Sequence, residues 1–212
     1  MRNIIYTSLI LAGILLSCPA SFAQSKFALS ATAAPFYSHN KSWGKFLFPA
    51  EDGSGTFVDQ DWQAESSATG FSAGLNGRYS FSPNWSASAG FWYNLSIPAD
   101  AGRSGRSHNF AIPLAVNLQT SDKKLSPYFS AGALWNFTTT SRLQVPDFGT
   151  IVVKSDNSYP KVAPTVAAGA IYHFAPKLSL VAQPNLTWFF PPANIKSRSY
   201  RLGLQMQLMW ML

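Results

Sequence analysis

Most of the chain alternates apolar and polar residues with a period of two. In the segment 71–81 the odd positions are apolar, as in Phe71, Leu75 and Tyr79, and polar residues such as Asn76 stand between them. A period of two over a dozen residues is typical of a β-strand with one apolar and one polar face. The same alternation predicts eight strands, over residues 26–33, 71–81, 85–97, 109–119, 128–137, 165–174, 178–188 and 200–210.

The connections between these segments alternate in length. The long ones cover about residues 39–69 and 139–161, the medium ones 98–107 and 190–198, and the short ones 82–84, 120–124 and 175–177. Membrane barrels of the bacterial outer membrane have long external loops and tight periplasmic turns, and tilted strands of about ten residues span the hydrocarbon layer. The pattern therefore predicts an all-β fold, an eight-stranded antiparallel up-and-down transmembrane β-barrel.

Aromatic residues fall where this topology needs them. One group would lie at the periplasmic rim, namely Phe27, Tyr79, Phe81, Trp85, Tyr172, Phe174 and Trp210. A second group would lie at the outer rim, namely Tyr37, Phe71, Phe110, Phe137, Trp188 and Tyr200. Two aromatic girdles are typical of a membrane barrel. The alternative, a soluble β-sandwich, would alternate as well but would need neither girdle.

Composition favours the membrane. Only 12% of the residues are charged, whereas 47% are apolar and 15% aromatic, and soluble domains carry about 25% charged residues. The formal net charge is +7. Its 16 Lys and Arg residues are scattered, and only Lys123 and Lys124 are adjacent. We therefore expect contact with anionic lipid head groups and no nucleic-acid partner.

The first residues have the features of a cleaved signal peptide. Arg2 provides the positive charge, residues 9–16 the apolar core, and Ser21-Phe22-Ala23 a cleavage site before Gln24. We expect residues 1–23 to be this signal peptide, residues 24–212 to be the barrel domain, and the destination to be the bacterial cell outer membrane. An alternative is that Cys18, the single cysteine, is lipidated instead of cleavage after Ala23.

Two segments carry a family resemblance. Residues 110–114 (Phe-Ala-Ile-Pro-Leu) and 125–132 (Leu-Ser-Pro-Tyr-Phe-Ser-Ala-Gly) resemble the central hairpin of the outer membrane protein β-barrel domain family common in Bacteroidetes. Over about residues 24–212 the chain is similar in size and topology to OmpX and to the membrane domain of OmpA. The resemblance implies a monomer inserted by the barrel-assembly machinery. Leu212 departs from the terminal aromatic residue usual in proteobacterial barrels, although Trp210 is close.

Two prolines oppose this pattern. Pro113 and Pro184 fall near the middle of predicted strands, where a proline removes a ladder hydrogen bond. We interpret both positions as β-bulges.

The interior of an eight-stranded barrel is just wide enough to be filled by side chains. By the alternation Arg78, Trp92, Tyr128, His173 and Arg201 point inward, beside inward glycines that leave them room. The expected result is a polar plug. The alternative is a narrow, porin-like, anion-preferring passage lined by the two arginines.

The predicted strands contain few groups suited to catalysis. Every Asp and Glu falls in a predicted loop or turn, and His39, His108 and His173 are not spaced as metal ligands. We expect no catalytic residue, metal or cofactor. A lipid A acyl hydrolase or acyltransferase is the alternative, because Ser107, His108 and Asp100 are the residue types of a triad. Adjacent strand residues point to opposite faces, however, so this Ser and His would not pair directly.

The predicted external loops differ in charge. Arg103, Arg106, Lys196 and Arg198 make the second and fourth loops basic, and we expect them to bind lipopolysaccharide phosphates. The acidic first loop, with its tryptophans, would meet a partner. The predicted function is structural or surface-binding, with outer-membrane lipid and lipopolysaccharide as partners.

Overall fold

The computed structural model describes residues 26–49, 57–99, 104–145, 149–154, 161–190 and 196–212. The predictions of a signal peptide over residues 1–23 and of an alternative lipid anchor at Cys18 lie outside these residues. The described strands are β1 (Phe27–Pro49), β2 (Phe57–Ser80), β3 (Trp85–Pro98), β4 (Ser104–Gln119), β5 (Leu125–Val145), β6 (Gly149–Lys154), β7 (Lys161–Ala175), β8 (Leu178–Phe189) and β9 (Lys196–Met211).

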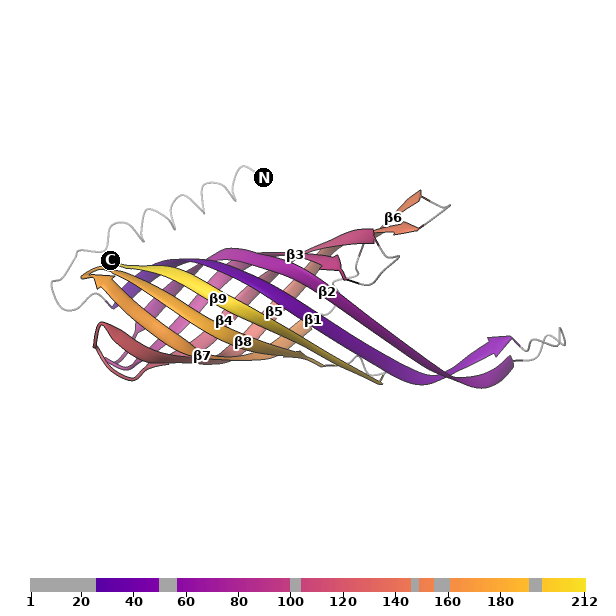
Figure 1. Ribbon diagram of the computed structural model, residues 1–212, viewed down its shortest axis with the longest axis horizontal. Helices are drawn as coiled ribbons and strands as arrows, with labels where there is room; N and C mark the ends of the chain where they lie inside the picture. The colour runs from indigo at the N-terminus through magenta and orange to yellow at the C-terminus, as the bar shows by residue number, and fades with distance from the viewer. Residues whose placement is uncertain (1–25, 50–56, 100–103, 146–148, 155–160, 191–195) are drawn as a thin grey trace, which may run out of the picture.

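Eight of these strands close into a ring. Each strand pairs antiparallel with the next along the chain, β5 pairs with β7, and β9 returns to pair with β1. The ninth, β6, pairs with the far end of β5 and lies beyond the barrel (Figure 1). The predicted eight-stranded, antiparallel, up-and-down barrel is confirmed. No helix in the described ranges is long and apolar enough to span a membrane.

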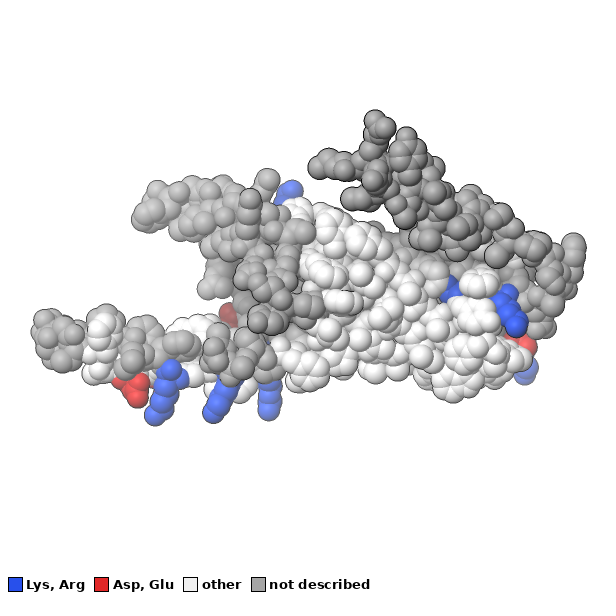
Figure 2. Space-filling view, turned by 180° about the vertical axis from the view of Figure 1, so that it is seen from behind, with Lys and Arg blue, Asp and Glu red and all other residues white. Residues whose placement is uncertain are grey.

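The alternation in sequence places apolar side chains on the outside of the wall. Leu75 is 70% exposed, whereas the neighbouring Asn76 is 7% exposed. On the face shown in Figure 2, the described charged side chains gather at the two ends, and the surface between them carries none. The exposed rings of Tyr37, Phe71 and Trp188 lie toward one end of this apolar belt. Those of Tyr79, Trp85 and Trp210 lie toward the other, as the two predicted girdles require.

The prediction of long loops over residues 39–69 and 139–161 is wrong. β1 and β2 stay paired from the barrel out to Pro49 and Phe57, and they form a ribbon that projects from one end (Figure 1). β5 likewise continues to Val145 and pairs with β6. The sequence did not indicate these strands, because a ribbon outside the membrane needs no apolar face and its residues are mostly polar. Consequently the acidic residues Asp59, Asp61 and Glu65 lie on a strand, where loop positions were expected.

The interpretation of Pro113 and Pro184 as bulges is also wrong. Near Pro113, Ala89 pairs with Leu114 and Trp92 pairs with Ala111, so the register is the same on both sides. Pairing between β3 and β4 is simply missing at the positions between them. A proline has no backbone N–H to donate, so its strand loses pairing only on the edge toward which that N–H would point. The other edges are intact, since Pro113 pairs with Leu134 and Pro184 with Leu204. Register shifts occur elsewhere, at His108/Asn109 and at His173/Ala175.

Candidate functional site

The five lumen residues predicted from sequence all lie on inward-facing strand positions, but they do not form one cluster. Trp92 lies in the middle of the barrel. Arg78, Tyr128 and His173 lie in the half that contains the C-terminus and the tight turns. Arg201 lies near the end from which the ribbon projects. In an outer-membrane barrel the tight turns are periplasmic, so the ribbon end is the outer end.

Asn76 is the centre of the mid-lumen contacts. The indole Nε1 of Trp92 donates a hydrogen bond of 2.8 Å to Asn76 Oδ1. Asn76 Nδ2 donates to Thr32 Oγ1 at 2.6 Å and to Ser30 Oγ at 3.4 Å. Gly74 leaves the space for this arrangement, because a Cβ at that position would overlap the Trp92 side chain. β1, β2 and β3 are therefore tied together across the interior.

A second set of polar contacts crosses from the opposite wall. Gln183 Nε2 donates to Gln205 Oε1 at 3.2 Å, and Ser130 Oγ donates to Gln183 Oε1 at 3.1 Å. A cavity of about 40 Å³ lies among Asn76, Trp92, Gln183 and Gln205. That volume has room for only a few water molecules. The middle of the lumen is thus packed with hydrogen-bonded side chains.

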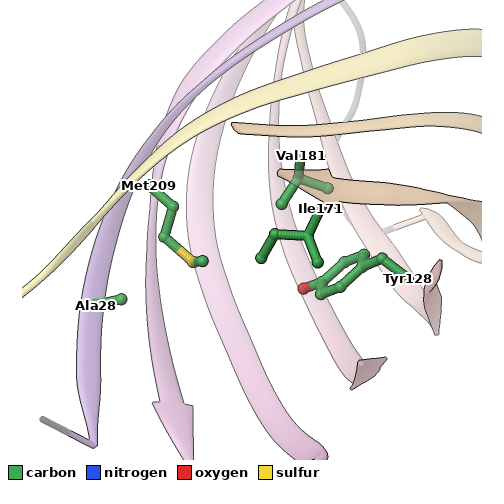
Figure 3. Close-up of a cluster of buried hydrophobic side chains, with 5 residues drawn as sticks. All are labelled: Ala28, Tyr128, Ile171, Val181 and Met209. Carbon is green, nitrogen blue, oxygen red and sulfur yellow. The ribbon is translucent and has the colours of Figure 1, made fainter. Parts of the chain in front are cut away.

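The periplasmic half is closed by an apolar cluster. Ala28, Tyr128, Ile171, Val181 and Met209 come from five strands and project toward one another (Figure 3). The guanidinium of Arg78 lies 5.3 Å from the centre of the Tyr128 ring and donates from Nη1 to Met209 Sδ at 3.4 Å. Sequence analysis missed the apolar members. Their inward strand parity was the available signal, and it was overlooked because the residues are apolar.

His173 is fixed by two polar neighbours next to this cluster. Gln119 Nε2 lies 3.1 Å from His173 Nε2, and Ser179 Oγ lies 2.7 Å from His173 Nδ1. An amide nitrogen only donates, so with this orientation the neutral imidazole accepts at Nε2 and donates from Nδ1. The ring therefore acts as a bridge between β4 and β8.

Arg201 fills the outer end of the lumen. Its guanidinium lies 4.1 Å from the centre of the Phe36 ring and 5.3 Å from that of Phe189, which is cation–π geometry. Its Nε atom is buried without a hydrogen-bond partner. Among the described residues neither Arg78 nor Arg201 has a carboxylate partner. The two arginines interact mainly with aromatic rings, at separate levels of the lumen.

A basic cluster lies on the outer face, next to the ribbon. Lys41 on β1 is paired across the sheet with Arg198 on β9, and Trp43 with Lys196. These positions share the strand parity of Tyr37 and Tyr200, so they are on the side of the wall that faces the membrane. Lys41 is four residues beyond Tyr37, about 13 Å along the strand. We call Lys41, Lys196 and Arg198 the outer basic cluster.

Lys41 also makes an ion pair between β1 and β2, next to the ribbon. Its Nζ lies 2.5 Å from Glu65 Oε1 on β2. The hydrogen bond from Lys41 and its charge hold the pKa of the Glu65 carboxyl below its ordinary value. The acidic residues Asp59, Asp61 and Glu65 thus lie on β2, whereas the outer basic cluster lies on β1 and β9.

Of the four predicted lipopolysaccharide-binding residues, Lys196 and Arg198 fall in the outer basic cluster. Arg106 is exposed on β4, on another side of the barrel, and Arg103 lies outside the described residues. Sequence analysis assigned Lys41 to the acidic loop. Only the register between β1 and β9 brings it beside Arg198.

Of the possible triad, Ser107 and His108 lie at adjacent positions of β4. His108 Nδ1 lies 2.5 Å from Tyr93 Oη. Asp100 lies outside the described residues. Among the described side chains no group of three His, Cys, Asp or Glu residues could hold a metal ion.

The closed ring, the apolar belt and the two girdles define an integral outer-membrane β-barrel. The sequence agrees, because residues 9–207 match the model of the outer membrane protein beta-barrel domain, and the chain belongs to this family. Its location is accordingly the bacterial outer membrane.

Two solved structures are similar to this chain. Neisserial surface protein A is 14% identical, covers 90% of this chain and 99% of its own, and superposes with a TM-score of 0.54. OprG from Pseudomonas aeruginosa is 9% identical, covers 89% of this chain and 98% of its own, and has a TM-score of 0.47. No curated protein matches the sequence. At 14% identity, Neisserial surface protein A supports the fold alone.

Proposed function

We propose that this protein is a surface-binding barrel that holds the phosphate groups of lipopolysaccharide on its outer basic cluster. The observation that carries the proposal is the position of Lys41, Lys196 and Arg198 on the membrane-facing side, beyond the outer aromatic girdle. Aromatic girdles lie at the level of the head groups. Cations slightly farther out therefore face the charged layer of the outer leaflet.

The geometry suits a multivalent anion. Lys41 and Arg198 lie on adjacent strands, whose backbones are about 4.8 Å apart, and Lys196 is about 7 Å farther along β9. A guanidinium forms bidentate contacts with phosphate, and a flexible lysine adds a point charge. Arg198 and Lys196 are both exposed, so their charges are accessible from the membrane side. Figure 2 shows Lys and Arg side chains in a row on one side of the ribbon.

The ribbon extends the same surface away from the membrane. Beyond the last pair of β1 with β9, Trp43 with Lys196, β1 and β2 continue as a two-stranded ribbon to Pro49 and Phe57. Its acidic β2 side, with Asp59 and Asp61 exposed, offers a contact for a basic partner. The packed lumen supports a role without ion conduction. The polar lumen residues lie at separate levels and do not form one cluster, which supports a role without catalysis.

A charge-matched binding experiment tests the proposal. The refolded barrel in phosphatidylcholine nanodiscs is titrated with lipopolysaccharide and with the same material after dephosphorylation. The test variant is Lys41→Gln/Lys196→Gln/Arg198→Gln. The control, Lys26→Gln/Lys123→Gln/Lys177→Gln, removes three exposed charges from the periplasmic end.

We expect the test variant to bind about 30-fold more weakly. A cation near an anionic surface contributes about 1 kcal/mol, and Lys41 is largely neutralised by Glu65, so about two effective charges are lost. The control should bind as the wild type does. Equal losses in both variants, or undiminished binding of the dephosphorylated material, would show the proposal to be wrong.

A further inference from the structure

Arg201 is an inward-facing cation close to the outer rim of the barrel. It is paired with Thr187 of β8, and the last β8–β9 pair, Phe189 with Ser199, is two residues farther out. Two residues of a strand span about 7 Å, so Arg201 lies that far below the rim on this side of the wall. The residue is only partly buried, and of its side-chain nitrogens only Nε is fully buried. The guanidinium is therefore accessible from the outer mouth of the lumen.

An aromatic ring covers one face of this guanidinium. The Phe36 side chain is only 7% exposed, and its ring lies against β2, where a Cβ at Gly70 would overlap it. The guanidinium carbon of Arg201 lies over this ring, 4.1 Å from its centre. The N–H donors of a guanidinium lie in its own plane, so stacking on a ring leaves them unused.

The neighbouring side chains on the inner face do not accept from these donors. Across the strands Arg201 is flanked by Ser38 and Thr187. Ser38 Oγ donates to the backbone oxygen of Ala68 at 3.2 Å, and Thr187 Oγ1 donates to Thr165 Oγ1 at 3.1 Å. Among the described residues the Nε atom of Arg201 has no hydrogen-bond partner, and its guanidinium has no ion pair.

The charge of Arg201 is unmatched as well. The acidic residues in the described part of the chain are Asp59, Asp61 and Glu65, which share the outward strand parity of β2, and Asp122, which lies between β4 and β5. None of these four faces the outer mouth of the lumen. A partly buried charge without a counterion is unfavourable, and an anion that binds beside it removes the imbalance.

We propose that Arg201 holds a small carboxylate that enters the outer mouth of the lumen from the external medium. A carboxylate is planar, and its two oxygens match the two parallel N–H groups that a guanidinium presents. Its single negative charge also matches the single positive charge of the site. A doubly charged phosphate would leave one charge uncompensated in a partly buried position. The packed middle of the lumen closes the site on its inner side, so the carboxylate binds at the outer end of the protein without passing through it.

NMR of the refolded barrel in phosphatidylcholine nanodiscs tests the proposal. Sodium acetate replaces sodium chloride at constant ionic strength and neutral pH, and the Nε–H signal of Arg201 and the methyl signal of Thr187 are followed. We expect both signals to shift and to saturate. Acetamide, which has the shape of acetate but no charge, should give no saturable shift. Phosphate should need a roughly tenfold higher concentration than acetate.

Two variants and one control complete the design, with the Thr187 methyl as the reporter. Arg201→Lys keeps the charge but lacks the planar pair of donors, so it should bind acetate about tenfold more weakly, as the loss of one charge-assisted hydrogen bond predicts. Arg201→Gln should lose saturable binding. Arg106→Gln is the matched control, because Arg106 is an exposed arginine on β4, and it should bind acetate as the wild type does.

The titration of the wild type decides the proposal even where a variant does not fold. Shifts that do not saturate with acetate, or half-saturation at the same concentration with acetamide, would overturn it. So would an Arg201→Gln barrel that binds acetate as the wild type does.

Discussion

The hydrogen bonds of Asn76 give the sharpest prediction for stability. Replacing Asn76 with Ala removes the acceptor of the Trp92 indole and the donor to Thr32 Oγ1, at 2.8 and 2.6 Å. The Thr32 hydroxyl can turn to another partner, but the indole N–H cannot. Trp92 is only 5% exposed, so its N–H is left buried in the lumen without this acceptor. A buried polar group that loses its partner costs about 1–3 kcal/mol, and the vacated volume adds to this. We expect the free energy of unfolding to fall by about 2–3 kcal/mol.

Urea unfolding in phosphatidylcholine vesicles measures this loss. A double-mutant cycle with Trp92→Phe, which removes the same N–H, isolates the pair, and we expect a coupling of about 1–2 kcal/mol. Asn40→Ala is the control, because the Asn40 side chain donates to Ser42 on its own strand in a part-buried position, and the loss of this bond should cost less than about 0.5 kcal/mol. An Asn76→Ala barrel as stable as the wild type, or strictly additive effects in the cycle, would refute the reasoning.

Other predictions follow from the belt and the ribbon. Leu75 lies midway between Phe71 and Tyr79 of the two girdles, so Leu75→Arg should destabilise the barrel in bilayers by about 2–4 kcal/mol. Thr69 is paired with Tyr37 at the level of the outer girdle, so Thr69→Arg should cost at most about 1 kcal/mol. Equal costs in a urea titration would contradict this depth assignment. The lowered pKa of Glu65 means that its ion pair with Lys41 survives as the pH falls through the ordinary glutamate range and is lost only at the lowered pKa. Carbon-detected NMR should show that Lys41→Met returns the Glu65 titration to the ordinary range, and an unchanged titration would exclude the ion pair.

The sequence alone predicts the barrel well because the membrane imposes a period of two. Leu75 must face lipid and Asn76 must face the lumen, so the alternation records both the strand and its orientation. Outside the membrane this constraint disappears. The polar stretch from His39 onward reads as a loop, although backbone pairing with β2 continues to Pro49.

The functional residues depend on register, which the alternation does not specify. Nothing in the sequence places Lys41 opposite Arg198, since the two are far apart in the chain and on different predicted loops. The unbroken register at Pro184 was equally hidden, because a proline in a strand signals a lost donor but not whether the strand bulges or keeps its register. Ile171 and Met209 occupy inward positions, and their apolar character concealed a core inside the lumen.

The central claim is that the strands enclose packed side chains and that binding takes place on the outer surface. Conductance of the refolded wild-type barrel in planar bilayers tests this claim most directly. With Arg78 against Tyr128 and Met209, and Arg201 between Phe36 and Phe189, the account predicts no sustained ion current. Steady anion-selective channels that disappear when either arginine is replaced would contradict it and would make the lumen the functional site.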